Sequence, residues 1–230
     1  MSLLIAVPCL DSVDTDFMTS MISLRKPEGT RFAVMKNSMI YDSRNSIASK
    51  AIVSETSEDP ADRYDRVLWI DSDMVFNPDL ISRLNADMDT GLDYVCGLCF
   101  VRKLPTYPVV YSEIKYWIDQ DGPHAEAVKM PDYPKNQLFR IAGSGFGCVM
   151  TSTKLLKDVW DHFGPPFDPM SHMGEDLTFC YHANQLGYEM YCDSRVKVGH
   201  VGSFTYDENV YFGQHMREAK QKTETIPEGM

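Results

Sequence analysis

Two aspartates follow an apolar run in the segment VLWIDSDMVF at residues 67–76. In extended backbone, residues i and i+2 point to the same side, so Asp71 and Asp73 can converge on one hard cation at the end of a strand. An Asp-rich turn after a strand is also common as plain turn chemistry. The pair therefore indicates a cation site only if other functional groups are placed beside it.

The elements around this pair alternate in type. Strand-like apolar runs at residues 3–8, 31–35, 67–70 and 94–101 are separated by segments with helical spacing at 14–24, from 42 onward and after 77. This alternation predicts an α/β fold with a mostly parallel, twisted sheet and helices on both faces. Ligands bind at the carboxyl ends of the strands in such sheets, where Asp11 and the turn at 71–73 fall.

The second half of the chain is less regular, because prolines break it into loops and short strands. We expect these strands to form a smaller antiparallel part, with residues 111–137 as a long irregular stretch of the kind that is usually functional. Regular structure is expected again at 139–151, in helices at 152–162 and 175–186, and in two strands at 188–192 and 196–198. No linker divides the chain, so one domain is predicted over residues 1–207, followed by a tail at 208–230.

The composition of the chain argues against some classes of function. The 230 residues can bury a full core, since 43% are apolar. With 22 Lys+Arg against 33 Asp+Glu, the formal charge is −11, which argues against a general binder of nucleic acid or of anionic membranes. An anionic ligand would need a metal ion or a local arginine.

The six cysteines are scattered among apolar neighbours rather than spaced as a disulfide framework or paired zinc ligands. We expect reduced, buried thiols in a cytoplasmic protein. The apolar runs are too short for a membrane span, and the first residues do not resemble a signal peptide.

Four motifs occur in the order found in GT-A-fold glycosyltransferases, and the sequence resembles the large family 2 of that group. AVPCLDS at 6–12 resembles the first strand and loop that hold the nucleoside, and WIDSDM at 69–74 resembles the Asp-x-Asp motif. GEDLTF at 174–179 resembles the Glu-Asp motif that opens a late helix, and VGHVG at 198–202 resembles the strand-end histidine of the metal site. IAGSGFGCVMTSTKLL at 141–156 resembles the Gly-rich turn, strand and helix beside donor sugar and acceptor.

The resemblance implies a GT-A-type (Rossmann-like) domain with a nucleotide-binding half at 1–101 and an acceptor and catalytic half at 102–207. It implies metal-dependent transfer of a hexose from a nucleoside-diphosphate sugar, preferably a UDP-sugar, to a hydroxyl of a glycan, lipid-linked or protein acceptor, with inversion. The implied nucleotide-sugar ligands are Pro8, Asp11, Arg44, Asp71, Ser72, Gly143, Ser144 and Gly145.

The same resemblance implies a metal site and a catalytic pair. Mn²⁺ or Mg²⁺ would be held by Asp73, His200 and Asp71, and the histidine nitrogen suits Mn²⁺ better. Asp176 would deprotonate the acceptor hydroxyl, while Glu175 would orient it or contact the acceptor.

Each of these residues also has a purely structural interpretation. Asp11 could cap the helix that follows it, and Arg44 could be an exposed residue at a helix start. His200 could be satisfied at the end of a core strand. Glu175 and Asp176 are favourable first-turn acids of a helix.

Three other functions use similar residues. A haloacid-dehalogenase-type phosphatase would use Asp71 as nucleophile and Asp73 as acid/base, although it would place them near the start of its catalytic domain. A nucleotidyltransferase would need a Gly-rich loop with Lys or Arg after the first strand, which PCLDSVD at 8–14 lacks. A non-catalytic carbohydrate-binding relative would bind glycan without binding or hydrolysing a nucleotide sugar.

Overall fold

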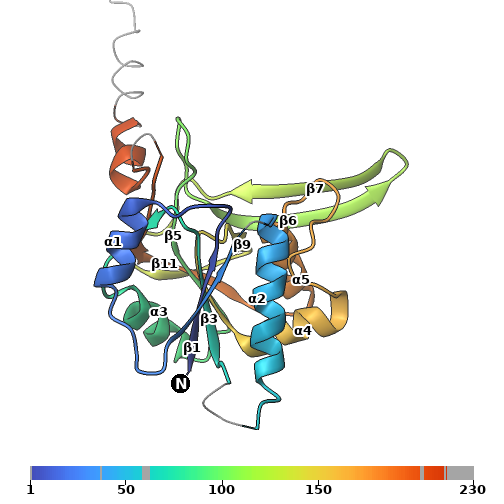
Figure 1. Ribbon diagram of the computed structural model, residues 1–230. Coiled ribbons are helices and arrows are strands. Elements are labelled where there is room, and N and C mark those ends of the chain that lie inside the picture. The colour runs from blue at the N-terminus through green and yellow to red at the C-terminus, as the bar shows by residue number, and fades with distance from the viewer. Residues whose placement is uncertain (1, 37, 59–62, 203–204, 215, 217–230) are drawn as a thin grey trace, which may run out of the picture.

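The computed structural model describes residues 2–36, 38–58, 63–202, 205–214 and 216, and its centre is a seven-stranded sheet (Figure 1). In spatial order the strands are β2 (Arg31–Met35), β1 (Leu3–Pro8), β3 (Arg66–Ile70), β10 (Cys148–Ser152), β5 (Tyr94–Leu98), β11 (Met190–Lys197) and β8 (Leu138–Ile141). β10 and β8 run against their neighbours, and the other five strands share one direction.

The central strands are apolar on both faces because both faces are covered. β1 is buried along its whole length between β2 and β3. Leu4 and Ala6 enter the hydrophobic cluster on one face of the sheet, and Ile5 and Val7 enter the cluster on the other. This burial explains why the first strands are continuous apolar runs rather than alternating ones.

Helices lie on both faces of the sheet. The clusters place α2 (Ile40–Ser54), α4 (Thr153–Phe163) and α5 (Glu175–Gln185) on one face, and α1 (Thr15–Ser23) and α3 (Leu80–Met88) on the other. The N-terminus of α1 is capped by Asp14, whose carboxylate accepts a hydrogen bond of 2.8 Å from the backbone N–H of Asp16. Asp11 is therefore not the cap of this helix.

The stretch expected to be irregular contains a long β-hairpin, so that expectation was wrong. β6 (Val110–Asp119) pairs with β7 (Gly122–Lys129) and, at its base, with β9 (Gly143–Ser144). The hairpin projects from the body of the molecule (Figure 1), and Tyr116 on β6 contacts Tyr181 of α5 at 6.0 Å between ring centroids. These strands make the smaller antiparallel part predicted for the second half.

A two-stranded pair carries the last motif back to the first half of the chain. β12 (Gly199–His200) pairs antiparallel with β4 (Met74–Val75), and His200 lies opposite Met74. The backbone N–H of Val201 also donates to the carbonyl of Asp73 at 2.8 Å. The histidine motif and the aspartate turn are thus adjacent in space although about 130 residues separate them in sequence.

The packed part of the chain extends beyond residue 207, the expected end of the domain. Residues 208–214 are helical, and Tyr211 is 4% exposed within the core cluster beside α2, α4 and α5. Its hydroxyl donates to the carbonyl of Pro131 at 2.7 Å. The tail predicted for 208–230 therefore begins later, and its part at 217–230 lies outside the described residues.

The fold class is the predicted one at the level of architecture: an α/β fold with a mostly parallel central sheet, helices on both faces and a small antiparallel sheet. Among the described residues, no helix is long and apolar enough to cross a membrane.

Candidate functional site

Asp71 and Asp73 lie in a turn that directly follows β3, at the carboxyl edge of the parallel strands. The backbone N–H of Asp71 donates to the carbonyl of Gly147 at 3.2 Å, and that of Met74 donates back to the carbonyl of Asp71 at 3.2 Å. These bonds turn the chain sharply after β3. Both carboxylates are 27% exposed, so they are reachable from solvent but partly desolvated.

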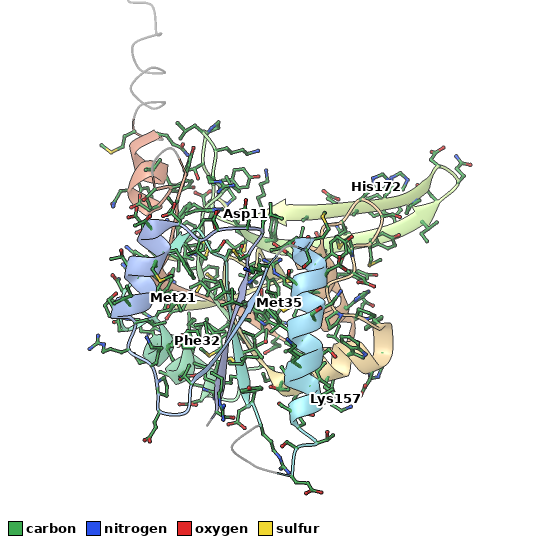
Figure 2. All side chains as sticks on the ribbon, viewed as in Figure 1. Asp11, Met21, Phe32, Met35, Lys157 and His172 are labelled. Carbon is green, nitrogen blue, oxygen red and sulfur yellow. The ribbon has the colours of Figure 1, made fainter. Side chains whose placement is uncertain are left out.

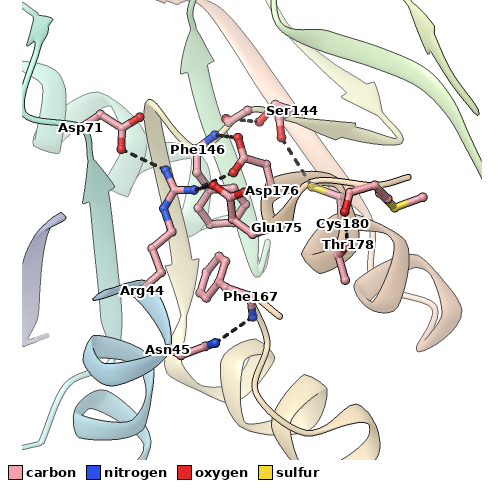
Figure 3. Close-up of polar contacts among 12 residues, drawn as sticks. Arg44, Asn45, Asp71, Ser144, Phe146, Phe167, Glu175, Asp176, Thr178 and Cys180 are labelled. Carbon is pink, nitrogen blue, oxygen red and sulfur yellow. Dashed lines mark hydrogen bonds and ion pairs between the residues drawn. The ribbon is translucent and has the colours of Figure 1, made fainter. Parts of the chain in front are cut away.

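Arg44 joins the first half of the chain to the second at this edge (Figure 3). It projects from α2 and is 2% exposed. Its Nη2 donates to Asp71 Oδ1 at 2.9 Å, while Nη1 donates to Glu175 Oε1 at 2.8 Å and to Asp176 Oδ1 at 2.6 Å. The expectation of an exposed arginine at the start of a helix is wrong for this residue.

Two aromatic rings also lie close to the same guanidinium. Its Cζ lies 5.3 Å from the ring centroid of Phe146 and 5.9 Å from that of Phe167. Phe167 is held in place by Asn45, the residue after Arg44, whose Oδ1 accepts from the Phe167 backbone N–H at 2.8 Å. These rings keep water away from the guanidinium and strengthen its ion pairs.

Burial and neighbouring charges set the protonation of this cluster. Desolvation acts to lower the pKa of Arg44, but Asp176, Asp71 and Glu175 together outweigh it and raise that pKa. Desolvation raises the pKa of Asp71, even though Arg44 acts against the shift. Desolvation followed by the nearby negative charge of Asp176 raises the pKa of Glu175 to about 7.

Asp176 is fixed through both of its carboxylate oxygens. Oδ1 accepts from Arg44, and Oδ2 accepts from the backbone N–H of Phe146 at 3.1 Å. A Cβ at Gly145 would lie 3.4 Å from that same Oδ2, so the backbone of the predicted Gly-rich turn passes next to the carboxylate. Glu175 and Asp176 open α5, as expected from the Glu-Asp motif.

The second group of donors is formed by Asp73 and His200. His200 Nε2 lies 3.1 Å from Asp73 Oδ2. Its Nδ1 lies 3.1 Å from the carbonyl oxygen of Phe100, which can only accept, so Nδ1 carries a proton. If the His200 ring is charged, Nε2 also carries a proton and donates it to Asp73. If the ring is neutral, Nε2 faces the carboxylate with a lone pair, and a cation between the two atoms would be needed to hold them together.

The pKa values of Asp73 and His200 are set by the attraction between the two side chains, which burial opposes. Desolvation acts to raise the pKa of Asp73, but the hydrogen bond and charge of His200, together with Arg102, outweigh it and lower that pKa. For His200, desolvation acts to lower the pKa, but the hydrogen bond and charge of Asp73 raise it overall. A divalent cation would replace the proton that the pair otherwise shares.

The geometry of the pair fits a divalent ion. Two ligands at right angles around a cation with bonds of about 2.1 Å are about 3.0 Å apart. The observed distance between Nε2 and Oδ2 is 3.1 Å. No group of three His, Cys, Asp or Glu side chains within the described ranges could hold a metal ion. The protein therefore offers two ligands, and a bound substrate or water would have to supply the others.

The remaining predicted ligands fall at the same edge but differ in accessibility. Pro8 ends β1 and is buried, whereas Asp11 is exposed near the carboxyl end of β1 (Figure 2). The loop that contains Asp11 is joined to the aspartate turn, because the backbone N–H of Asp14 donates to the carbonyl of Ser72 at 2.9 Å. Asp11, Ser72 and Asp71 thus lie on neighbouring loops, and their contacts to a nucleotide stay predictions.

Gly143 and Ser144 have structural roles that their motif did not suggest. A Cβ at Gly143 would lie 2.6 Å from Ile114 Cδ1 and 2.7 Å from Cys180 Cβ, so the close approach permitted there is to protein side chains. Ser144 is 2% exposed, and its hydroxyl is 2.8 Å from that of Tyr94. We therefore expect neither side chain to contact a sugar directly.

Sequence reasoning missed Arg102. Its Nη1 donates to Asp73 Oδ2 at 2.6 Å, the oxygen that also faces His200. Arg102 follows the predicted strand at 94–101 and directly precedes Lys103, and no motif marks it as part of the site. The charge of −11 did indicate that an anionic ligand would need a local arginine.

Comparisons with known proteins bear on the fold. No family model and no curated protein sequence matches this chain. Its structure resembles that of A197 from STIV, with a TM-score of 0.62 and 16% identity over 88% of this chain and 86% of that chain. Residues 1–349 of S. aureus TarS match with a TM-score of 0.47 and 14% identity, over 84% of this chain and 58% of that chain. The likeness to A197 shows a shared fold.

Proposed function

We propose that this protein is a metal-dependent glycosyltransferase that uses a nucleoside-diphosphate sugar. The observation that supports the proposal is the pair of Asp73 Oδ2 and His200 Nε2, 3.1 Å apart, with Asp73 in the same turn as Asp71, which Arg44 links to Glu175 and Asp176. An open two-ligand cation site suits a substrate that brings its own oxygen ligands, and a diphosphate does so.

Asp73 and His200 would hold the ion, and Mn²⁺ suits the mixed oxygen and nitrogen donors better than Mg²⁺. When bound, such an ion neutralises the negative charge that develops on a leaving diphosphate. The protein needs this help because its own charge of −11 repels the donor. Asp71 keeps one oxygen on Arg44 and would contact the ribose or the ion with the other.

Asp176 would act as the base. Arg44 and the Phe146 N–H hold its two oxygens in fixed positions, and each oxygen keeps a lone pair for the acceptor hydroxyl. Asp176 would take that proton while the hydroxyl oxygen bonds to the anomeric carbon from the face opposite the nucleoside diphosphate, whose bond to that carbon breaks; this single displacement inverts the carbon. Glu175, with its pKa raised to about 7, would orient the acceptor or its neighbour Asp176.

The finer parts of the proposal follow the family resemblance. The donor would be a UDP-hexose, and the acceptor a hydroxyl of a glycan, a lipid-linked sugar or a protein. The six cysteines are free and buried, which is compatible with a reducing compartment, so we place the protein in the cytoplasm.

The first test is thermal unfolding with UDP, GDP, CDP or dTDP, each with Mn²⁺, Mg²⁺ or chelator. At a ligand concentration of about 100 times Kd, binding adds about 2.7 kcal/mol, which raises Tm by about 5–10 °C for a chain of this length. We expect one diphosphate to give this shift and chelator to abolish it. No shift with any diphosphate would contradict the proposal and favour the phosphatase or the glycan-binding function.

Two substitutions separate binding from chemistry. Asp73→Ala should abolish the metal-dependent shift, because it removes the ligand oxygen. Asp176→Asn should keep that shift and lose release of nucleoside diphosphate from the sugar donor, since the amide cannot accept the acceptor's proton. Full turnover in Asp176→Asn would disprove the base assignment, and phosphate release from simple monoesters that is lost in Asp71→Asn would support a phosphatase.

A further inference from the structure

Asp73 carries two cationic partners on a single oxygen. His200 Nε2 and Arg102 Nη1 lie 3.1 Å and 2.6 Å from Asp73 Oδ2. A divalent ion bound between Asp73 and His200 would need the same oxygen. The guanidinium and the ion would then share one carboxylate oxygen and repel each other through their like charges. Binding of the ion therefore favours departure of Arg102 from Asp73.

Of the two partners, Arg102 is the one able to move. Its side chain is 52% exposed, whereas that of His200 is 24% exposed and tied to the backbone carbonyl of Phe100. Arg102 lies in the loop after β5, and the stem of its side chain crosses Gly202. A Cβ at Gly202 would lie 2.9 Å from Arg102 Cγ and 3.0 Å from its Cδ, so the glycine makes room for the stem.

The backbone near Arg102 is firmly held while its side chain is free to swing. Val101 N–H donates to the carbonyl of Tyr107 at 3.1 Å, and Thr106 Oγ1 donates to the carbonyl of Val101 at 2.8 Å. A long side chain on a fixed backbone can move from one partner to another a few ångströms away with little disturbance of the structure around it. The nearest new partner would be the negative group that arrives with the ion.

We propose that Arg102 holds the cation position on Asp73 in the unliganded protein, and that it transfers to the diphosphate of the donor when the ion binds. This inference rests on the proposed function. Arg102 is then a diphosphate-binding residue, kept on Asp73 until the substrate arrives. Arginine suits the second role because its planar fork matches phosphate oxygens in a bidentate fashion.

The exchange couples two ligands. Without a nucleotide, a binding ion displaces Arg102 from Asp73, and the charged guanidinium then has to be solvated by water. With a diphosphate present, the displaced guanidinium gains a new anion, so ion and nucleotide each strengthen the binding of the other. The protein would bind the ion weakly alone and well as a complex with the diphosphate.

The test is titration of Mn²⁺ followed by the electron paramagnetic resonance signal of the free ion, with and without UDP. The variants are Arg102→Ala and, as a matched control, Arg83→Ala, another half-exposed arginine that pairs with Asp79 away from this edge. We expect Arg102→Ala to bind Mn²⁺ alone about twofold to fivefold more tightly than the natural chain. UDP should enhance Mn²⁺ binding less in Arg102→Ala than in the natural chain, and Arg83→Ala should behave as the natural chain does.

The outcomes distinguish this inference from the proposed function. If the natural chain binds Mn²⁺ with UDP but Arg102→Ala binds Mn²⁺ alone no more tightly, the inference fails and the glycosyltransferase proposal stands. If neither chain binds Mn²⁺ with or without UDP, both fail.

Discussion

Arg44 holds three carboxylates together, and its own side chain has almost no contact with solvent although each carboxylate is partly exposed. At 2% exposure it pairs with Asp71, Glu175 and Asp176, and its charge is the one that compensates theirs. Such an arrangement adds little net stability over apolar packing, because desolvation opposes the attraction. Its removal is costly all the same, since it leaves several partly buried acids without a counter-charge.

We therefore expect Arg44→Met to lower the free energy of unfolding by about 3–5 kcal/mol near neutral pH. The loss should shrink at lower pH, because protonation of the carboxyls then removes the uncompensated charge. Urea denaturation at pH 5 and pH 8 measures both effects. Arg83→Ala, which removes an exposed arginine, should change the stability little at either pH, and an Arg44→Met variant as stable as the natural chain would contradict the assigned role.

Glu175 gives stability a pH dependence of its own. Its pKa is raised to about 7 in the folded protein from an ordinary value of 4.5, first by desolvation and then by Asp176. Between these values the folded state binds more protons than the unfolded state, so stability falls as pH rises through that window. Asp87, with a pKa raised to about 6 chiefly by burial, acts in the same direction.

Glu175→Gln should accordingly flatten the decline in stability between about pH 4.5 and pH 7, while Asp87 retains its part. The measurement is the free energy of unfolding at half-unit pH steps for the variant and the natural chain. Equal slopes in the two proteins would show that Glu175 does not take up its proton in this range.

At the scale of elements, the sequence predicted the first half well. In the second half it also predicted the helices at 152–162 and 175–186, which match α4 and α5 to within one residue, but it missed the hairpin. The expected strands at 3–8, 31–35, 67–70 and 94–101 match β1, β2, β3 and β5 to within three residues at either end. Their two-sided burial produces continuous apolar runs that are visible without knowing their partners. The hairpin of β6 and β7 was missed because its strands are largely exposed and contain Pro123, Gly122 and several charged residues.

One signal could have revealed the hairpin. Asp121 and Gly122 form an Asp-Gly pair between two potential strands, and Gly122 has a positive φ of 110°. For the site, the motifs predicted Asp73, His200, Glu175 and Asp176; the structure pairs Asp73 with His200 and places Glu175 and Asp176 on Arg44, while their roles stay predictions. It is the Arg44 pairings that no local pattern could predict, because the three acids come from positions 27, 131 and 132 residues away.

Gly143 joins the hairpin to α5, and its lack of a side chain permits that contact. A Cβ there would meet Ile114 of β6 at 2.6 Å and Cys180 of α5 at 2.7 Å. Gly143→Ala should therefore cost about 1–3 kcal/mol of stability through overpacking. Gly174→Ala, at the N-terminus of α5, is the matched control because a methyl group added there would meet nothing within 4 Å. Chemical denaturation of both variants decides whether the strand and the helix are in such close contact.

At the scale of the whole molecule, the site lies where the two halves of the chain meet. Arg44, Asp71 and Asp73 come from residues before 101, while Glu175, Asp176 and His200 come from after 102. β10 enters the sheet between β3 and β5, and β11 lies beside β5, so the two halves share one central sheet and one core. This shared sheet holds the Asp73–His200 pair and the carboxylates bound to Arg44 at the same edge.

The core also includes part of residues 208–214. The neighbouring aromatic residues Tyr211 and Phe212 allow a buried and an exposed side chain of this segment to be compared. Tyr211 is 4% exposed and bonds to the carbonyl of Pro131, whereas Phe212 is 41% exposed. Tyr211→Ala should lower the free energy of unfolding by about 3–5 kcal/mol, because it empties a buried aromatic site and leaves that carbonyl without its donor. Phe212→Ala should cost much less, since most of what it removes faces water. Urea denaturation of the two variants measures the difference, and equal losses would mean that this segment is not part of the core.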